Sequence, residues 1–152
     1  MAHAMTAEQV HNVLAYLVKA GKLQPVDGMV AVWRDVLTGV RYGDAIEACR
    51  SLAAGEAGWL TPGHLFGEVR RLRRARIGNR SAPAPPPSVA GDGWAQLRFQ
   101  RAYIEALGDG DDDDVADERA CAAVGVHREP EVLVAVDVAG LIERGGPDGA
   151  GD

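Results

Sequence analysis

The sequence predicts an all-α protein, with a small four-helix N-terminal domain at residues 6–77, a Pro-rich linker at 78–93 and a second, smaller helical segment at 94–144. Two observations support this fold class. Apolar residues recur at helical spacing four times before residue 78, each time followed by a glycine, and prolines cluster in the segment that comes next. Residues 145–152 are rich in glycine and are expected to form a disordered tail.

The first helix is predicted to begin after Thr6 and to end at Gly21. Thr6 and Gln9 have the spacing of a capping box, in which the Thr hydroxyl accepts a backbone N–H and the Gln side chain accepts the N–H of the cap residue. Glycine at position 21 can take the left-handed conformation that ends many helices. The apolar stripe of this helix comprises Val10, Val13, Leu14, Leu17 and Val18.

The second and third helices are predicted at 25–39 and at about 43–55. A proline and an aspartate favour the start of the second, and Trp33 lies at the centre of its apolar stripe. In the third, Asp44 and Glu47 lie in the first turns, where negative charge is stabilised by the helix dipole. Small apolar residues on its stripe allow close packing against a neighbouring helix.

The fourth helix is predicted to begin at Thr61-Pro62, an N-cap followed by the residue best suited to the first helical turn. Its apolar stripe comprises Leu65, Phe66, Val69 and Leu72. Four helices of this length enclose one modest core, which suffices for a domain of this size without disulfides or metal.

A cluster of arginines ends the fourth helix. At 100° per residue, Arg70, Arg71 and Arg74 point away from the apolar stripe and share one exposed face, which suits phosphate or an acidic protein patch. Arg73 and Arg76 fall nearer the apolar side and are expected to lay their stems across the edge of the core. The alternative is that these cations only complement the helix dipole and keep the surface soluble.

The linker and the segment after it differ in character. Residues 78–93 hold four prolines among small polar residues and are predicted to be a solvated, semi-stiff tether. Residues 94–107 have helical composition with apolar residues on two sides. Such a helix either packs within the chain, which is the favoured alternative, or inserts into a groove of a partner. The candidate partner-binding residues are Trp94, Leu97, Phe99 and Tyr103.

The acidic run at 111–114 does not fit a calcium loop, because Asp114 stands where glycine is needed and Ala120 where a bidentate Glu is needed. The run is better explained as the start of a helix at 115–124, where negative charge is favourable. Residues 131–142 are ambiguous: a proline precedes them, yet valines alternate as in a strand, and helix is only weakly favoured.

Composition and motifs argue against an enzyme. The chain has no phosphate-binding loop, no paired His or Cys ligands for zinc and no nucleophile elbow, so no catalytic residue, metal site, cofactor or small-molecule substrate is predicted. Residues 1–80 hold eleven Lys/Arg against seven Asp/Glu, and residues 81–152 hold five against fifteen, so any nucleic-acid contact belongs to the first half. With two cysteines and no apolar leader or membrane-length stretch, the protein is expected to be cytoplasmic and not membrane-bound.

The order of landmarks in residues 6–77 resembles the phage replicative helicase loader/inhibitor family. The matching stretches are Val32-Trp33-Arg34-Asp35-Val36-Leu37, Tyr42-Gly43-Asp44-Ala45 with Ala48, and Leu60-Thr61-Pro62 leading to Val69-Arg70 and Leu72. The resemblance implies a helical N-terminal domain joined to a more mobile C-terminal part that contacts the ring-shaped helicase. It also implies that the loader itself hydrolyses no ATP.

Two functional hypotheses lead, and a third is a helical protein with a structural or oligomerising role. The first is a non-enzymatic adaptor that binds a hexameric replicative (DnaB-type) helicase and loads or inhibits it during phage or prophage DNA replication, with the helix after the linker as its anchor. The second is a DNA-binding helical module that uses Arg70, Arg71 and Arg74. They differ in salt dependence, because phosphate contacts weaken steeply as salt rises whereas an aromatic anchor does not.

Overall fold

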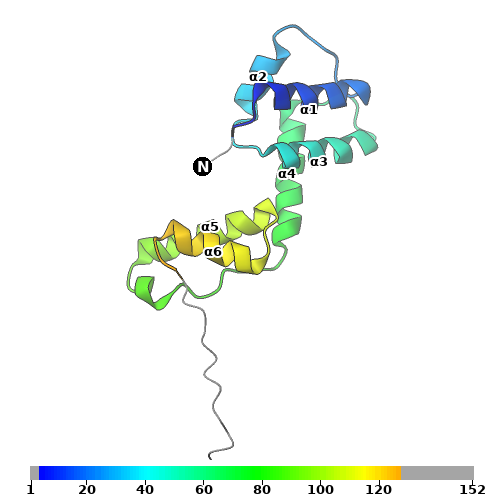
Figure 1. The fold of residues 1–152 in the computed structure, drawn as a ribbon. Helices are drawn as coiled ribbons and strands as arrows, with labels where there is room; N and C mark the ends of the chain where they lie inside the picture. Colours follow the sequence, from blue (N-terminus) through cyan, green and yellow to red (C-terminus); the bar gives the residue numbers. More distant parts are fainter. Residues whose placement is uncertain (1–3, 128–152) are drawn as a thin grey trace, which may run out of the picture.

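A computed structural model describes residues 4–127 of the chain. Six α-helices and one 3-10 turn follow one another, and the described part contains no β-strand, which confirms the predicted all-α class. The elements are α1 (Ala7–Lys19), α2 (Met29–Val36), α3 (Tyr42–Ala54), α4 (Pro62–Ile77), the turn η1 (Pro87–Val89), α5 (Gly93–Asp109) and α6 (Asp113–Ala123) (Figure 1). The predictions for 131–142 and for the tail at 145–152 lie outside the described residues.

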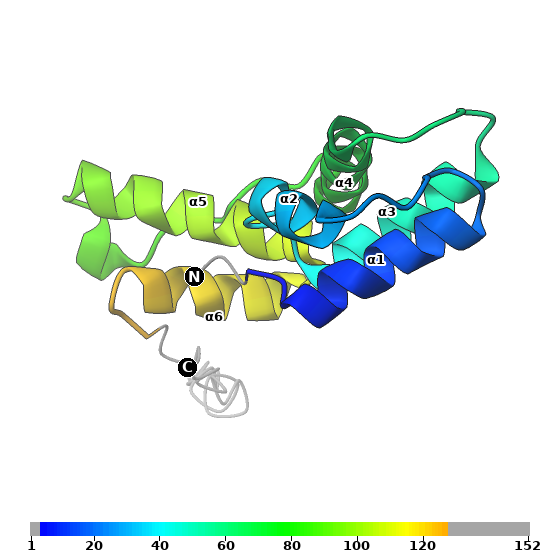
Figure 2. The same cartoon turned by 90° about the horizontal axis from the view of Figure 1, so that it is seen from above.

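Helix α4 connects two groups of helices. α1, α2 and α3 gather around its N-terminal half, whereas α5 and α6 form an antiparallel pair at its C-terminal end (Figure 1, Figure 2). α4 packs against α3 in the first group and against α5 in the second. The described chain is therefore elongated, with α4 as the element that both groups share.

Two of the helix starts confirm the capping predicted from the sequence. At α1, the Gln9 backbone N–H donates to Thr6 Oγ1 at 3.2 Å and the Thr6 N–H donates to Gln9 Oε1 at 3.0 Å. At α4, the Thr61 N–H donates to Nδ1 of His64 at 3.0 Å, so a histidine takes the part that Gln9 has in α1. Both arrangements satisfy backbone donors that the first helical turn leaves without an intrahelical partner.

The start of α2 differs from the sequence prediction. The helix begins at Met29 rather than near Pro25, and its N-cap is Gly28 with a φ of 77°, which makes no side-chain capping bond. A left-handed φ suits glycine and is strained for other residues, so Gly28 decides where the helix begins. Trp33 is buried at its centre, as predicted, whereas Val36 on the predicted stripe is partly exposed.

The first core lies between α1, α2, α3 and the N-terminal half of α4. It contains most of the apolar stripes expected from periodicity and is closed by small residues of α3 that permit close approach. Its buried members are Met5, Val10, Val13, Leu14, Leu17, Trp33, Leu37, Val40, Ala45, Ala48, Cys49, Leu60, Leu65 and Val69.

A second core lies between α5 and α6. Its buried members are Phe99, Tyr103, Ala106, Leu107, Ala116, Ala120 and Cys121. The acidic run begins α6 as predicted, because the side chain of Asp112 accepts the N–H of Val115 at 2.9 Å. The small residues on α6 bring its backbone close to α5, so a short helix is enough to close this core.

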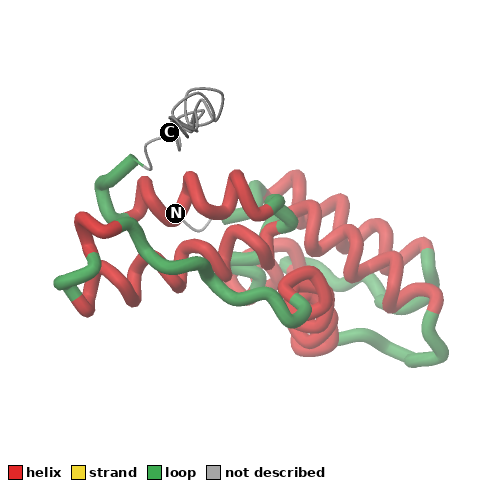
Figure 3. Tube along the Cα trace, turned by 90° about the horizontal axis from the view of Figure 1, so that it is seen from below, coloured by secondary structure: helices red, strands yellow, loops and turns green. Residues whose placement is uncertain are grey.

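Most residues of the linker at 78–93 are exposed, as expected of a solvated tether, but the linker is also attached to the helices at a few points. Pro86 and Val89 are buried, and Ala82 packs against the second core. The turn η1 contacts α5, and Figure 3 shows the connection from α4 running along the α5–α6 pair. Proline prevents helix here but fits a packed extended strap, so composition alone could not separate a tether from a strap.

Candidate functional site

Helix α5 presents an apolar face that no described residue covers. Trp94 is 79% exposed and Leu97 is 51% exposed, whereas Phe99 and Tyr103 are buried in the second core. The four predicted partner-binding residues therefore divide into two pairs on opposite sides of one helix. Phe99 and Tyr103 pack within the chain, so the prediction that these two residues belong to a partner-binding surface is corrected.

The period of the helix produces this division. Phe99 and Tyr103 are spaced by one turn and face α6, whereas Trp94, Leu97 and Arg101 are spaced by three and four residues and lie on the opposite side. Asp92 fixes the start of the face, because its carboxylate accepts the backbone N–H of Trp94 at 2.9 Å. We refer to Trp94, Leu97 and the flanking Arg98 and Arg101 as the docking face.

The docking face continues toward α4 as a shallow groove of about 500 Å³. The groove is lined by Arg73, Ile77, Gln100, Arg101, Ile104 and Glu105. Ile104 and Ile77 are partly buried and carry the apolar character of the face to the end of α4. From Gly93 to Ile104, α5 contains two arginines and no acidic residue. A partner that matches this surface is apolar with acidic flanks.

Tyr103 is anchored on the core side of α5. Its hydroxyl donates to Asp113 Oδ1 at 2.7 Å, which joins α5 to the first turn of α6. Burial, together with this hydrogen bond to a carboxylate, raises the pKa of Tyr103 to about 12. The side chain therefore stays a neutral donor and holds the α5–α6 pair together.

The predicted arginine face of α4 is present but is less positive than its sequence suggests. Arg70, Arg71 and Arg74 are all exposed. Arg71 makes two hydrogen bonds with Glu68, from Nε to Oε2 at 2.9 Å and from Nη2 to Oε1 at 2.6 Å. These bonds from Arg71 lower the pKa of the Glu68 carboxyl, so the pair stays ionised and neutralises itself. Within residues 4–127, Arg70 and Arg74 make no ion pair.

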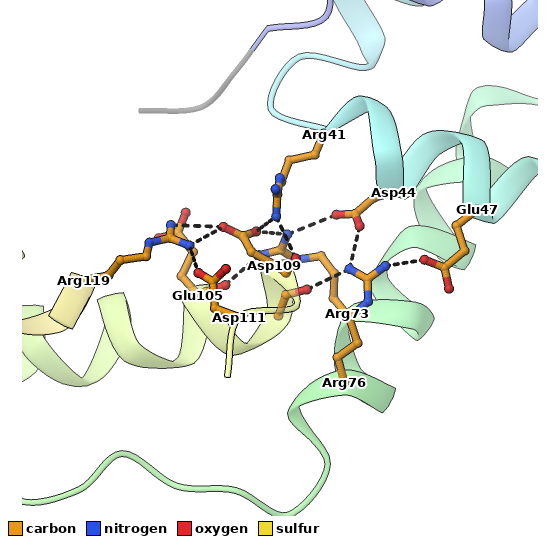
Figure 4. Close-up of polar contacts among 10 residues, drawn as sticks. Arg41, Asp44, Glu47, Arg73, Arg76, Glu105, Asp109, Asp111 and Arg119 are labelled. Atoms are coloured by element: carbon orange, nitrogen blue, oxygen red, sulfur yellow. Dashed lines mark hydrogen bonds and ion pairs between the residues drawn. The ribbon is translucent and has the colours of Figure 1, made fainter. Parts of the chain in front are cut away.

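Arg73 and Arg76 have a different position from the exposed three. They reach from α4 into a cluster of ion pairs between the two helix groups, which we call the ionic junction (Figure 4). Arg73 Nη1 donates to Asp109 Oδ1 at 2.6 Å and to Asp44 Oδ2 at 3.3 Å, and Arg76 Nη1 donates to Asp44 Oδ1 at 2.5 Å. Asp44, expected to act at the helix dipole, is buried and paired with both arginines.

The other half of the ionic junction surrounds Asp109 at the end of α5. Arg119 of α6 donates to Asp109 Oδ2 at 3.1 Å and also hydrogen-bonds Asp111, while Arg41 Nη1 lies 3.5 Å from Asp109 Oδ1 (Figure 4). Burial by itself would raise the pKa of Asp109. The hydrogen bonds from Arg73 and Arg119 and the nearby positive charges outweigh burial and hold the pKa below its ordinary value.

A cleft of about 910 Å³ opens beside the ionic junction, between α3, α4, α5 and α6. Its polar lining combines arginines with the carboxylates that pair with them, and its apolar lining includes Phe66, Val69 and Ala102. Asp109 is held as a carboxylate by guanidinium groups, so it is not poised to donate a proton near neutral pH. The charged residues of the cleft therefore hold the helix groups together.

Two features of the structure were not predicted from the sequence: an exposed tryptophan in the loop before α4, and the ionic junction. Trp59, in the loop before α4, is 67% exposed, and Lys22 Nζ ties that loop down by donating to the carbonyls of Gly55 at 2.8 Å and Ala57 at 2.6 Å. The ionic junction was also missed, because the pairs that tie Arg73 and Arg76 to Asp44 and Asp109 span 29 to 36 residues of sequence and no periodic signal links them. A short motif search detects neither feature.

No protein family matches the chain, and neither a curated protein nor a solved structure is detectably similar to it. Among residues 4–127, no group of three or more His, Cys, Asp or Glu side chains is arranged to hold a metal ion. Across the same stretch, none of the helices combines the length and apolar character needed to cross a bilayer.

Proposed function

We propose that this protein is a non-enzymatic adaptor that binds a hexameric replicative helicase and loads or inhibits it in phage or prophage DNA replication. The observation that carries the proposal is the docking face, with Trp94 79% and Leu97 51% exposed one turn apart on α5. Large apolar side chains in this arrangement are typical of protein-binding surfaces, and tryptophan is prominent among binding hot spots. The helicase as partner rests on the resemblance of residues 6–77 to the loader/inhibitor family.

The position of the docking face supports an adaptor role. It lies on α5, which packs against α6, and the ionic junction joins the two helix groups through α4 (Figure 4). A partner bound at α5 is thus held in a defined position relative to α1, α2 and α3. Fixed geometry of this kind needs no nucleotide hydrolysis by the adaptor.

The proposal is tested by measuring the affinity of the full chain for a purified helicase hexamer by calorimetry. Trp94→Ala with Leu97→Ala removes the apolar part of the docking face without touching the core, and we expect affinity to fall by about 100-fold or more. Trp59→Ala is the matched control, because it removes an equally large exposed aromatic from another surface. Far-UV circular dichroism should be unchanged in all variants.

The adaptor proposal is wrong about its site if the Trp94→Ala, Leu97→Ala double variant binds the helicase as tightly as the parent chain does. It is wrong about its partner if the parent chain binds no replicative helicase. Equal losses in the double variant and in Trp59→Ala would mean that the docking face has no special part in binding.

A second candidate function is DNA binding by the exposed face of α4. The observation in its favour is that Arg70 and Arg74 are exposed and make no ion pair within the described chain. Because Glu68 pairs with Arg71, two arginines remain to neutralise two phosphates, which gives a salt slope of about −1.8 in log K against log salt, and Arg70→Glu with Arg74→Glu should abolish binding. Arg98→Glu on α5 is the control. A slope near zero in duplex DNA titrations would exclude this function.

A further inference from the structure

We propose that Arg41, Arg73 and Asp109 form an occupied phosphate site, in which the Asp109 carboxylate holds the place that a nucleic-acid phosphate takes when it displaces the carboxylate. This inference rests on the second candidate function, DNA binding through Arg70 and Arg74, and adds two arginines to it. It does not involve the docking face.

Guanidinium groups from three different parts of the chain converge on the Asp109 carboxylate. Arg73 Nη1 of α4 donates to Asp109 Oδ1 at 2.6 Å, and Arg119 Nη1 of α6 donates to Oδ2 at 3.1 Å. Arg41, the residue before α3, places its Nη1 3.5 Å from Oδ1 (Figure 4). Carboxylate and phosphate both present paired acceptor oxygens, and guanidinium groups bind either anion with parallel N–H donors. The side chains around Asp109 therefore have the geometry of an anion site that the chain itself fills.

The site can be reached from solvent through the cleft of about 910 Å³. Arg41, Arg70, Arg73 and Asp109 all line this cleft. The Arg41 side chain is 46% exposed. Arg70 is exposed and makes no ion pair within residues 4–127. An anion that enters the cleft therefore meets an unpaired cation in Arg70 and has Arg41 and Arg73 in the same space.

Arg41 is the arginine that gains most from an exchange of anions. It lies 3.5 Å from the Asp109 carboxylate and makes its hydrogen bond to the Asp109 backbone carbonyl instead, at 2.7 Å. A carbonyl is a neutral acceptor, so a phosphate oxygen offers Arg41 a stronger, charge-assisted hydrogen bond. Arg73 keeps a second carboxylate, Asp44, at 3.3 Å when Asp109 is displaced. The exchange therefore leaves neither guanidinium group without an anion.

A chain of phosphates is the ligand that suits this site. A free phosphate ion competes poorly with Asp109, because the carboxylate belongs to the same chain and is present at a high effective concentration. DNA already held by Arg70 and Arg74 has the same advantage, since a duplex carries one charge per ~1.7 Å of its axis and presents further phosphates beside those already bound. Asp109 should therefore reduce, but not prevent, the binding of nucleic acid to the free protein.

The site is tested by titrating the full chain into labelled duplex DNA over a series of salt concentrations. In the parent chain, the exposed face of α4 alone gives a slope of about −1.8 in log K against log salt. Asp109→Asn removes the internal anion, so Arg41 and Arg73 bind two more phosphates, the slope steepens to about −3.6 and affinity at low salt rises about tenfold or more. Asp114→Asn is the matched control, because it changes the net charge equally but removes an exposed carboxylate that makes no ion pair within residues 4–127. Its slope should equal that of the parent.

The results separate the site from the candidate function that it extends. Equal slopes in the parent and in Asp109→Asn overturn the occupied site and keep DNA binding by the exposed face of α4. DNA binding by Asp109→Asn and not by the parent supports the site and refutes the exposed-face function, whereas no DNA binding by either chain overturns both. A slope that steepens in Asp114→Asn as well assigns the change to net charge and overturns the site. Binding of inorganic pyrophosphate by Asp109→Asn without any binding of DNA overturns nucleic acid as the ligand.

Two further variants keep the test decisive. Asp109→Ser is a second neutral replacement, and if far-UV circular dichroism shows that neither it nor Asp109→Asn folds, the proposal is wrong, because the carboxylate is then indispensable to the fold rather than a replaceable occupant. Adding Arg41→Gln to Asp109→Asn should bring the slope back to about −2.7, since one phosphate contact is lost. A slope that stays at about −3.6 would exclude Arg41 and overturn the site as proposed.

Discussion

Arg73 Nη1 donates to Asp109 Oδ1 at 2.6 Å and so joins the middle of α4 to the last residue of α5. The same guanidinium reaches buried Asp44 on α3, so one side chain contacts both helix groups (Figure 4). Apolar burial holds each core separately, whereas charge sets how the two groups are joined. Predictions about stability therefore differ for the cores and for the junction.

Asp109→Asn should weaken the junction more than its position at a helix end suggests. The substitution removes the negative charge that Arg73, Arg119 and Arg41 share, and leaves their guanidinium groups without it. Because these arginines remain partly exposed, we expect a loss of about 2 kcal/mol in the free energy of unfolding by urea rather than the larger cost of a fully buried pair.

Asp114→Asn is the control for that measurement. Asp114 is also an acidic residue near the turn between α5 and α6, but it is exposed and makes no ion pair in the described part of the chain. It should cost less than about 0.5 kcal/mol, through the helix dipole alone. Similar losses in the two variants would mean that the junction adds nothing to stability.

Acid should destabilise the junction over a defined pH range. The pKa of Asp109 is held below its ordinary value in the folded chain, so its contribution is present above the unfolded pKa of about 3.9 and is lost as pH falls through the folded pKa. Urea midpoints should be level from pH 7 to about 5 and fall below about 4. Asp109→Asn should show a smaller fall than the parent chain, and an identical fall would contradict this account.

Phe99→Ala should lower the stability of the protein, whereas Leu97→Ala should lower its affinity for a partner. Phe99 is fully buried in the second core, so its truncation should cost about 3–5 kcal/mol of unfolding free energy. Leu97 is half exposed on the docking face, so its truncation should cost less than about 0.5 kcal/mol and act on partner binding instead. The unfolding free energy of each variant, measured by chemical denaturation, distinguishes the core side of α5 from its outer side. A stable Phe99→Ala protein would contradict the burial of this ring.

Cys49 should resist thiol reagents in the native protein. Burial raises the pKa of its thiol to about 12, so almost no thiolate exists at pH 8. In a Cys121→Ala background, labelling of Cys49 by a disulfide reagent at pH 8 should be absent over minutes and complete after addition of urea. Fast labelling without urea would show that the first core opens locally.

The four N-terminal helices were predictable because each carries a strong local signal. Thr6 with Gln9 and Thr61 with Pro62 mark helix starts, and the stripes that follow them form the first core. The start of α2 was misplaced because a proline and an aspartate suggested a cap, whereas the left-handed Gly28 sets the boundary. Local chemistry thus gave the elements more reliably than their exact ends.

The candidate site was less predictable, since it depends on which side of a helix finds a partner within the chain. Trp94 and Phe99 have similar hydrophobicity, and only the packing of α6 determines that Phe99 is buried and Trp94 is not. The ion pairs of Asp44 were likewise not predictable from the sequence, because its partners Arg73 and Arg76 lie on a helix about 30 residues later. Pairings at such separation leave no periodic trace in one sequence.

The continuity of α4 has a consequence for how the molecule comes apart. Its first turns are embedded in one core through Leu65 and Val69, and its last turns supply Ile77 to the other. Helix formation is cooperative, so unfolding of α4 in one core also favours its unfolding in the other core. Local unfolding in one helix group should therefore lower the stability of the other group, because both pack against α4.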